Sequence, residues 1–208
     1  IRYSLPASPM SHAIRIHAYG GPDVMQWEPH DPGEPGRGEA LIRQTAVGLN
    51  FIDVYERTGL YPNALPSGLG REGAGVVEAL GPGVRGLVVG ERVAYVSSQA
   101  GSYAQRRCMA ADRLVTIPDG VSDRLAAAAL LKGLTAQFLL RRTHRVRKGD
   151  VVVIHAAAGG VGLIAAQWAR HLGATVIGVV GSEAKAEFAR GHGCHHTLIL
   201  GRDALPAK

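Results

Sequence analysis

The glycine-rich segment AAAGGVG at 156–162 constrains the fold of this chain more than any other feature. It follows an apolar run at 151–154, which predicts a buried strand, and it opens a segment in which Val161, Ile164 and Ala165 recur at helical spacing. A helix that begins at such a turn presents unpaired backbone N–H groups and positive partial charge, which attract phosphate. Glycines let this backbone approach a pyrophosphate closely. We interpret the turn as a dinucleotide site.

The spacing alone also fits a strand–helix turn that needs glycines only for close packing, because Ala156 stands where the commoner fingerprint has its first Gly. The context favours nucleotide binding. A second strand is expected at 174–180, a helix near 182–190 and a third strand at 197–200. Strand, helix, strand, helix, strand is the first half of a doubly wound parallel sheet. The groups expected to face the cofactor here are Ala158, Gly159, Gly160, Val161 and Gly162.

Composition fits a globular protein with a turn-rich β portion, since 46% of the 208 residues are hydrophobic and 28 are glycines. No apolar stretch is long enough to cross a bilayer, and the two cysteines suit a reducing cytoplasm.

The formal net charge is +6, with the densest basic cluster at 141–148. No aromatic residues interleave with that cluster, so a solvated helix end is favoured over a nucleic-acid surface. We expect neither a membrane nor a nucleic-acid partner.

The segment from Met10 to about Ile117 has the sequence pattern of an antiparallel β domain, because its short apolar runs are separated by Gly- and Pro-rich turns. The prolines at 29, 32 and 35 predict a loop over 29–37, and Ser122 is a candidate cap for a helix over 123–142. Residues 1–9 are interpreted as a vector-derived or otherwise non-native leader. The expected strands are 14–18, 40–44, 75–79, 92–96 and 114–117.

Several segments together resemble the zinc-independent quinone oxidoreductases, the zeta-crystallin-like branch of the medium-chain dehydrogenase/reductase superfamily. The matching pieces are GLNFIDVYERTGLYP at 48–62, LPSGLGREGAGVVEALGPGV at 65–84, GERVAY at 90–95, LLKGLTAQFLLRR at 130–142 and HAAAGGVGLIAAQWARHLGA at 155–174.

This resemblance implies a GroES-like β domain at 10–125, followed by a partial Rossmann domain at 126–208. The family places NADPH and substrate in the cleft between these domains. Its chains continue beyond this length to complete the Rossmann sheet, so we expect a C-terminally truncated chain. Zinc-dependent relatives carry Cys where this chain has Asn50 and a GHE triplet where it has Gly70, Arg71 and Glu72. Because an amide and a cationic guanidinium are poor zinc ligands, we expect no metal.

The end of the second expected strand bears on the choice of cofactor. An Asp or Glu there usually accepts from the ribose 2′-OH of NAD, whereas this chain has Gly181, Ser182 and Lys185. These residues favour the 2′-phosphate of NADP, and Glu183 weakens that interpretation. The family usually adds a tyrosine where this chain has Leu200, a loss for which Arg202 is a candidate substitute.

The resemblance also assigns residues around the nicotinamide and the substrate. Asn50, Tyr55 and Tyr61 match positions of the β domain, where an amide or a phenol can bond a carboxamide or a quinone oxygen. Lys132 and Thr135 match positions that reach the nicotinamide end. Without the resemblance, the tyrosines are equally compatible with core or rim packing, and Lys132 with an exposed helix lysine.

The function expected from these features is NADPH-dependent reduction of a quinone, with the nicotinamide supplying the chemistry and the protein supplying position and water exclusion. One alternative is an enone or alkenal reductase of the same superfamily. The other is a non-catalytic, crystallin-like protein that binds NADPH or RNA. We expect a cytoplasmic protein that forms a homodimer at full length.

Overall fold

The computed structural model describes residues 10–203, so the expected leader at 1–9 lies outside the described residues. The chain divides between Leu130 and Leu131 into two compact units. We call these the first unit and the second unit. Among the described residues, no helix is both long enough and apolar enough to cross a membrane.

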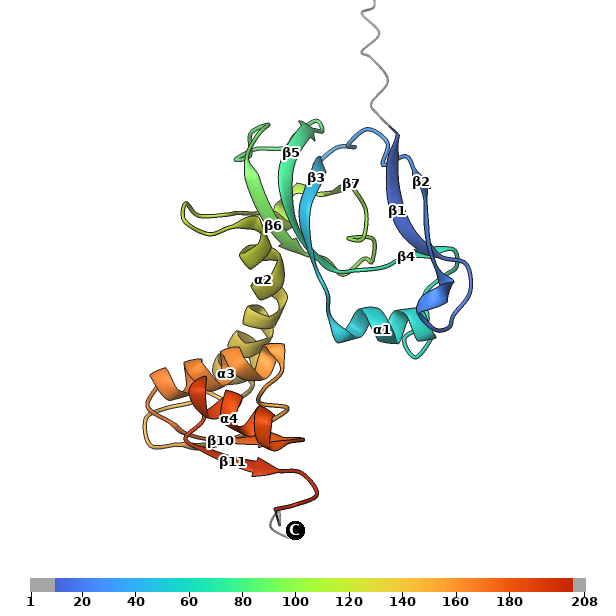
Figure 1. The fold of residues 1–208 in the computed structure, drawn as a ribbon. Helices are drawn as coiled ribbons and strands as arrows, with labels where there is room; N and C mark the ends of the chain where they lie inside the picture. The colour runs from blue at the N-terminus through green and yellow to red at the C-terminus, as the bar shows by residue number, and fades with distance from the viewer. Residues whose placement is uncertain (1–9, 204–208) are drawn as a thin grey trace, which may run out of the picture. The chain divides into compact units, whose positions relative to one another are not determined.

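The first unit is built from antiparallel strands (Figure 1). One sheet has the order β7-β3-β5-β6-β8, and a three-stranded sheet has the order β2-β1-β4. Buried side chains of the larger sheet form one core, which consists of Ala40, Ile42, Val77, Val93, Tyr95 and Met109. The elements are β1 Ser11–Ile16, η1 Pro22–Val24, β2 Met25–His30, β3 Glu39–Gly48, α1 Phe51–Thr58, β4 Ser67–Gly68, β5 Glu72–Leu80, β6 Arg92–Val96, β7 Arg106–Ala110, η2 Ala111–Arg113 and β8 Val115–Thr116.

Two of these elements correct the sequence analysis. The predicted loop over 29–37 begins only after His30, because β2 runs through Pro29. That proline is tolerated since β2 pairs with β1 alone among the described strands, and an edge position needs no ladder donor. Helix α1 was not predicted at all. It begins after Asn50, whose N–H donates to Asp53 Oδ2 at 2.9 Å, and ends at Gly59 with a φ of 80°.

The second unit contains the predicted parallel sheet, with the order β11-β10-β9 (Figure 1). Helix α3 packs against β9 and β10, and α4 packs against β10 and β11. Fully buried small side chains, among them Ala166, Ala169 and Val176, make this close packing possible. The elements are β9 Val151–His155, α3 Gly160–His171, β10 Thr175–Val180, α4 Glu183–Gly191 and β11 His196–Ile199.

The helix predicted over 123–142 is present as two consecutive pieces. Helix α2 spans Asp123–Gln137, and a π-helical stretch, η3, follows over Phe138–Thr143. The predicted fold class is confirmed: an antiparallel β unit of the GroES-like kind precedes three parallel strands of a Rossmann-like sheet.

Candidate functional site

The glycine turn between β9 and α3 has the geometry of a phosphate-binding turn. Ala156 leaves β9 with a positive φ of 50°, and the Gly159 N–H donates to its carbonyl at 2.8 Å. Gly159 then precedes α3 in an extended conformation, without a side-chain cap. The first N–H groups of a helix lack intrahelical acceptors, so this turn offers donors and positive partial charge to an anion. The structure brings Ala158 to Gly162 together there, as predicted.

The glycines in this turn have different roles. A Cβ on Gly162 would lie 2.4 Å from Ala156 O and 2.7 Å from the Ala157 Cα, so this residue must be glycine for α3 to pack on the turn. A Cβ on Gly159 would meet only Ala156 O, at 3.1 Å. Gly159 therefore keeps the approach to the helix N-terminus open, whereas Gly162 permits the packing that positions it.

Lys132 and Thr135, both on α2, differ in what their side chains do. A Cβ on Gly160 would come within 2.7 Å of Lys132 Cδ, so the lysine stem runs along the first turn of α3. The Thr135 hydroxyl donates to Leu131 O at 2.8 Å and is therefore engaged within its own helix. Lys132 therefore lies beside the glycine turn, and the hydroxyl of Thr135 makes a local bond. That both residues reach the nicotinamide end stays a prediction.

A cavity of about 280 Å³ in the first unit and another of about 470 Å³ in the second lie open to solvent. The larger one borders the glycine turn and is lined by Gly159, Gly160, Val161 and Gly162 together with apolar side chains of η3 and β9.

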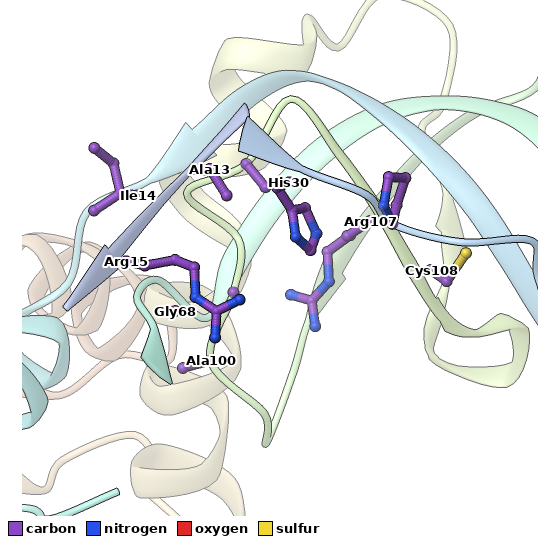
Figure 2. A pocket seen from close by; sticks show the side chains of 11 residues that line it. Ala13, Ile14, Arg15, His30, Gly68, Ala100, Arg107 and Cys108 are labelled. Atoms are coloured by element: carbon purple, nitrogen blue, oxygen red, sulfur yellow. The ribbon is translucent and has the colours of Figure 1, made fainter. Parts of the chain in front are cut away.

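The smaller cavity contains none of the predicted site residues. Figure 2 shows Arg15, His30 and Arg107 around it. Arg107 is buried, donates to Ser102 Oγ at 3.1 Å and lies 5.3 Å from the centre of the Tyr95 ring. Burial and the neighbouring Arg15 lower the pKa of His30. This cavity is cationic, and we assign it no part in the site.

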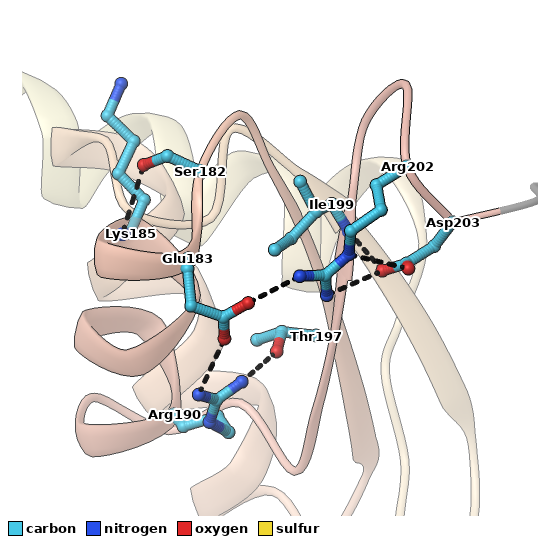
Figure 3. Close-up of polar contacts among 8 residues, drawn as sticks. All are labelled: Ser182, Glu183, Lys185, Arg190, Thr197, Ile199, Arg202 and Asp203. Atoms are coloured by element: carbon cyan, nitrogen blue, oxygen red, sulfur yellow. Dashed lines mark hydrogen bonds and ion pairs between the residues drawn. The ribbon is translucent and has the colours of Figure 1, made fainter.

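The carboxyl end of β10 carries the residues predicted to select the cofactor (Figure 3). Gly181 is open, since a Cβ there would meet nothing within 4 Å. Ser182 caps α4, its Oγ accepting from the Lys185 N–H at 3.4 Å, and Figure 3 shows the Lys185 side chain extending away from the neighbouring ion pairs. A hydroxyl, a free lysine side chain and a helix N-terminus therefore meet at this end of the strand.

The predicted substrate-side residues lie on and beside α1. Asn50 is buried, and its Nδ2 donates to Glu72 Oε2 at 2.9 Å. The Tyr55 ring contacts both Phe51 and Tyr61 edge to face, each at 5.3 Å between ring centres. Tyr61 is half exposed. The structure therefore groups the two tyrosines at the end of α1 and places Asn50 in a buried polar contact.

Arg71, at one of the positions compared with zinc ligands, forms an ion pair instead. Its guanidinium contacts the carboxylate of Glu56, which is 1% exposed, and the carbonyls of Ser97 and Ser98. Among residues 10–203, no three His, Cys, Asp or Glu side chains are grouped as metal ligands would be.

Sequence reasoning missed both arginine partners of Glu183, Arg202 and Arg190, and only the contact with Arg190 has a local signal. Glu183 and Arg190 are seven positions apart on α4, a spacing that places them on the same face of a helix two turns apart. That spacing is the signal that could have revealed the pair.

The fold and the site together define a Rossmann-like unit, with a glycine turn suited to an anion, in the same chain as a GroES-like β unit. Residues 36–119 match the family model described as the alcohol dehydrogenase GroES-like domain, and residues 160–204 match the model described as zinc-binding dehydrogenase.

Individual proteins similar to this chain are quinone oxidoreductases and a 2-haloacrylate reductase. The chain is 51% identical over 190 residues to a quinone oxidoreductase of Pseudomonas aeruginosa and 50% identical over 196 residues to a 2-haloacrylate reductase of a Burkholderia species. Each match covers 91% of this chain. The matched region is 58% of the length of the Pseudomonas protein and 59% of the length of the Burkholderia protein. The structure of Escherichia coli quinone oxidoreductase complexed with NADPH superimposes with a TM-score of 0.91 at 43% identity, covering 93% of this chain and 60% of that one.

Over the part of these proteins that it covers, this chain is similar to the quinone oxidoreductases. It spans about three-fifths of the length of the relatives it matches.

Proposed function

We propose that this chain is part of an NADPH-dependent quinone oxidoreductase. The observation that carries the proposal is the uncapped N-terminus of α3, opened by Gly159 and held in place by the packing of Gly162. Backbone donors at that position suit a pyrophosphate. The relatives called quinone oxidoreductase, and the NADPH complex of one such enzyme, support the same reading.

The residues present fit NADPH. Gly159 and Gly160 leave room for the diphosphate at the start of α3, and the exposed Lys185 and Ser182 provide a cation and a hydroxyl for the 2′-phosphate. When bound, the reduced nicotinamide supplies the hydride or electrons that reduce the acceptor. The protein supplies position and orientation and excludes water.

Residues of the first unit are proposed to serve the acceptor. Tyr61 is half exposed and its phenol is available to donate a proton to a quinone oxygen, while Tyr55 holds its ring in place through an edge-to-face contact. Asn50, buried with its amide bonded to Glu72, is proposed to serve the nicotinamide or ribose, as the family resemblance implies.

The proposal is tested first by binding. Isothermal titration of the chain with NADPH and with NADH is expected to show saturable binding with a preference for NADPH, and added 1,4-benzoquinone is expected to oxidise NADPH. Absence of binding to either nucleotide would rule out the cofactor site. Binding without oxidation would instead favour the non-catalytic alternative.

A second candidate activity is reduction of a conjugated enone or a related electron-poor alkene. It is favoured by one observation, the 50% identity to a protein called 2-haloacrylate reductase. Comparing NADPH oxidation rates on 1,4-benzoquinone and on 2-chloroacrylate distinguishes the two candidates. The quinone is expected to react faster.

Lys185 provides a residue-level test of cofactor choice. Replacing it with alanine removes a cation from the 2′-phosphate site, so the Kd for NADPH is expected to rise about tenfold while the Kd for NADH changes little. Equal losses for the two nucleotides would show that Lys185 is uninvolved in the choice.

The alternative of a nucleic-acid-binding protein is tested by gel migration of RNA. Retarded migration that disappears with rising salt would support this alternative.

The remaining features of the full protein are proposals of the same kind. We propose a cytoplasmic protein, consistent with the free thiols of Cys108 and Cys194, and a homodimer. Light scattering of the full-length protein would test the dimer.

A further inference from the structure

The carboxyl ends of β10 and β11 bring together charged residues that are distant in sequence. The two strands pair in parallel with Val180 opposite Ile199, and the Leu200 N–H donates to Val180 O at 2.8 Å. As a result, Arg202 reaches the first residue of α4, and its Nη1 lies 2.6 Å from Glu183 Oε2 (Figure 3). In doubly wound proteins this edge of the sheet faces the ribose of the cofactor.

Glu183 is the residue that would be expected to prefer NADH, because it stands about twenty residues after the glycine turn, where an acidic side chain accepts from the ribose 2′-OH. Both of its carboxylate oxygens are already occupied. Oε2 accepts from Arg202, and Oε1 lies 3.4 Å from Arg190 Nη2. The hydrogen bonds from Arg202 and Arg190 also lower the pKa of Glu183.

Arg202 is held in turn by its neighbour. Its Nε lies 3.1 Å from Asp203 Oδ1 and its Nη2 lies 3.5 Å from Asp203 Oδ2, while Oδ2 accepts from the Ile199 N–H at 2.7 Å. A guanidinium has five N–H donors, and these contacts among the described residues use three of them. Arg202 is thereby fixed by backbone-anchored acceptors, with donors left for a further anion.

The charges of this group favour a phosphate. Arg190, Arg202 and Lys185 contribute three positive charges, and Glu183 and Asp203 contribute two negative ones, which leaves a net positive charge at the end of β10. The ion pairs are exposed, and exposed pairs contribute little to folding stability. A purely structural role is therefore a weak explanation for so many contacts at a ligand-binding edge.

We propose that Arg202 is a specificity-determining residue for NADPH. It acts in two ways: it withdraws the Glu183 carboxylate from the ribose, and it donates its remaining N–H groups to the 2′-phosphate. The inference rests on the proposed function, since it concerns the same cofactor site. Glu183 is then a positioning residue for Arg202 rather than a partner of the ribose.

The test is nucleotide binding measured by isothermal titration of the 208-residue chain. In Arg202→Met, the Kd for NADPH is expected to rise about tenfold, since a charge-assisted hydrogen bond is lost. The Kd for NADH is expected to fall, because Glu183 is released to accept from the 2′-OH. The fragments 2′,5′-ADP and ADP should show the same two trends without any involvement of nicotinamide or turnover.

Two further variants separate the two effects. Arg202→Met combined with Glu183→Gln should keep the weakened NADPH binding and lose the gain for NADH. Arg202→Lys keeps the positive charge but not the several N–H donors of the guanidinium. Its Kd for NADPH should therefore lie between those of the unaltered chain and Arg202→Met. The matched control is Arg113→Met, an exposed arginine of the first unit whose removal should alter neither affinity.

The outcomes distinguish this inference from the proposed function. If the unaltered chain prefers NADPH and Arg202→Met changes both nucleotides equally, or neither, the role of Arg202 is wrong and the cofactor site stands. If the unaltered chain binds neither nucleotide nor 2′,5′-ADP, the proposed function fails and this inference fails with it.

Discussion

Glu56 and Glu183 are both paired with arginine, but in opposite surroundings. Glu56 in the first unit is 1% exposed and contacts Arg71, whereas Glu183 in the second unit has a side chain that is 62% exposed and contacts Arg202 and Arg190. A buried carboxylate that loses its cation cannot be solvated, but an exposed one can. In the first unit, charge pairing therefore stabilises the fold, whereas in the second unit we propose that it arranges groups at the cofactor site.

The largest effect expected from this comparison is on the stability of the first unit. Arg71→Met leaves the buried Glu56 carboxylate uncompensated, and we expect the free energy of unfolding to fall by about 3–5 kcal/mol. Urea unfolding can follow this unit through Trp27 in a Trp168→Phe background, since the chain has one tryptophan in each unit.

Glu56→Gln combined with Arg71→Met should restore part of the loss, because no charge is then buried alone. Arg113→Met, which removes an exposed pair, is the matched control and should change stability little. An unaltered midpoint in Arg71→Met would contradict the assigned role of the buried pair.

The second prediction concerns the glycine that positions the turn. Gly162→Ala places a Cβ 2.4 Å from Ala156 O, so α3 must move, and the second unit should lose about 1–3 kcal/mol of stability. The measurement is urea unfolding followed by Trp168 in a Trp27→Phe background. Gly181→Ala is the control, because its Cβ would meet nothing within 4 Å and stability should be retained.

The third prediction separates binding from folding at the same turn. In Gly159→Val the new Cβ would lie 3.1 Å from Ala156 O, a close contact, so we expect the second unit to fold with a small local adjustment of the turn. The substitution should raise the Kd for NADPH at least about tenfold, because the branched side chain blocks the approach to the helix N-terminus. Titration calorimetry with circular dichroism on the same sample checks both parts. Near-normal affinity would refute the position assigned to the diphosphate.

The smallest effect is a pH dependence in the first unit. Burial raises the pKa of Asp53 above its usual 3.8, against the opposing hydrogen bond from the Tyr103 hydroxyl. Because the folded state then holds this proton more tightly, the contribution of Asp53 to stability is present below pH 3.8 and is lost as pH rises through the raised value.

Asp53→Asn removes that titration while keeping an oxygen acceptor for the Asn50 N–H. The stability of the unaltered chain relative to this variant should therefore decrease from pH 4 towards neutrality, as measured by urea unfolding across that range. If the stability difference between the unaltered chain and Asp53→Asn stays constant or grows with pH, the pKa of Asp53 is not raised by burial.

The two units also differ in how well sequence reasoning anticipated them. The elements of the second unit follow the predicted ranges closely, because β9 and β10 are short apolar runs, each followed at once by a Gly-containing turn and an amphipathic helix. In the first unit, β2 and β7 contain few apolar residues in alternation, and they were missed. Both are stabilised by pairing with distant segments, β2 with β1 and β7 with β3.

The site divides in the same way. The glycine turn and the residues after β10 could be located from local spacing, since strand, turn and helix are contiguous in sequence. The contact of Glu183 with Arg202 could not, because Arg202 reaches it only through the parallel pairing of β10 with β11. Likewise, the contact of Asn50 with Glu72 joins residues separated by twenty-two positions.

Local pattern alone determined that this chain contains a β unit followed by a parallel α/β unit, and where an anion would meet a helix N-terminus, because backbone conformation and hydrophobic periodicity act over a few residues. Tertiary structure decided which charges neutralise one another. Burial and register bring Arg71 to Glu56 and Arg202 to Glu183, and no pattern within one segment records such distances.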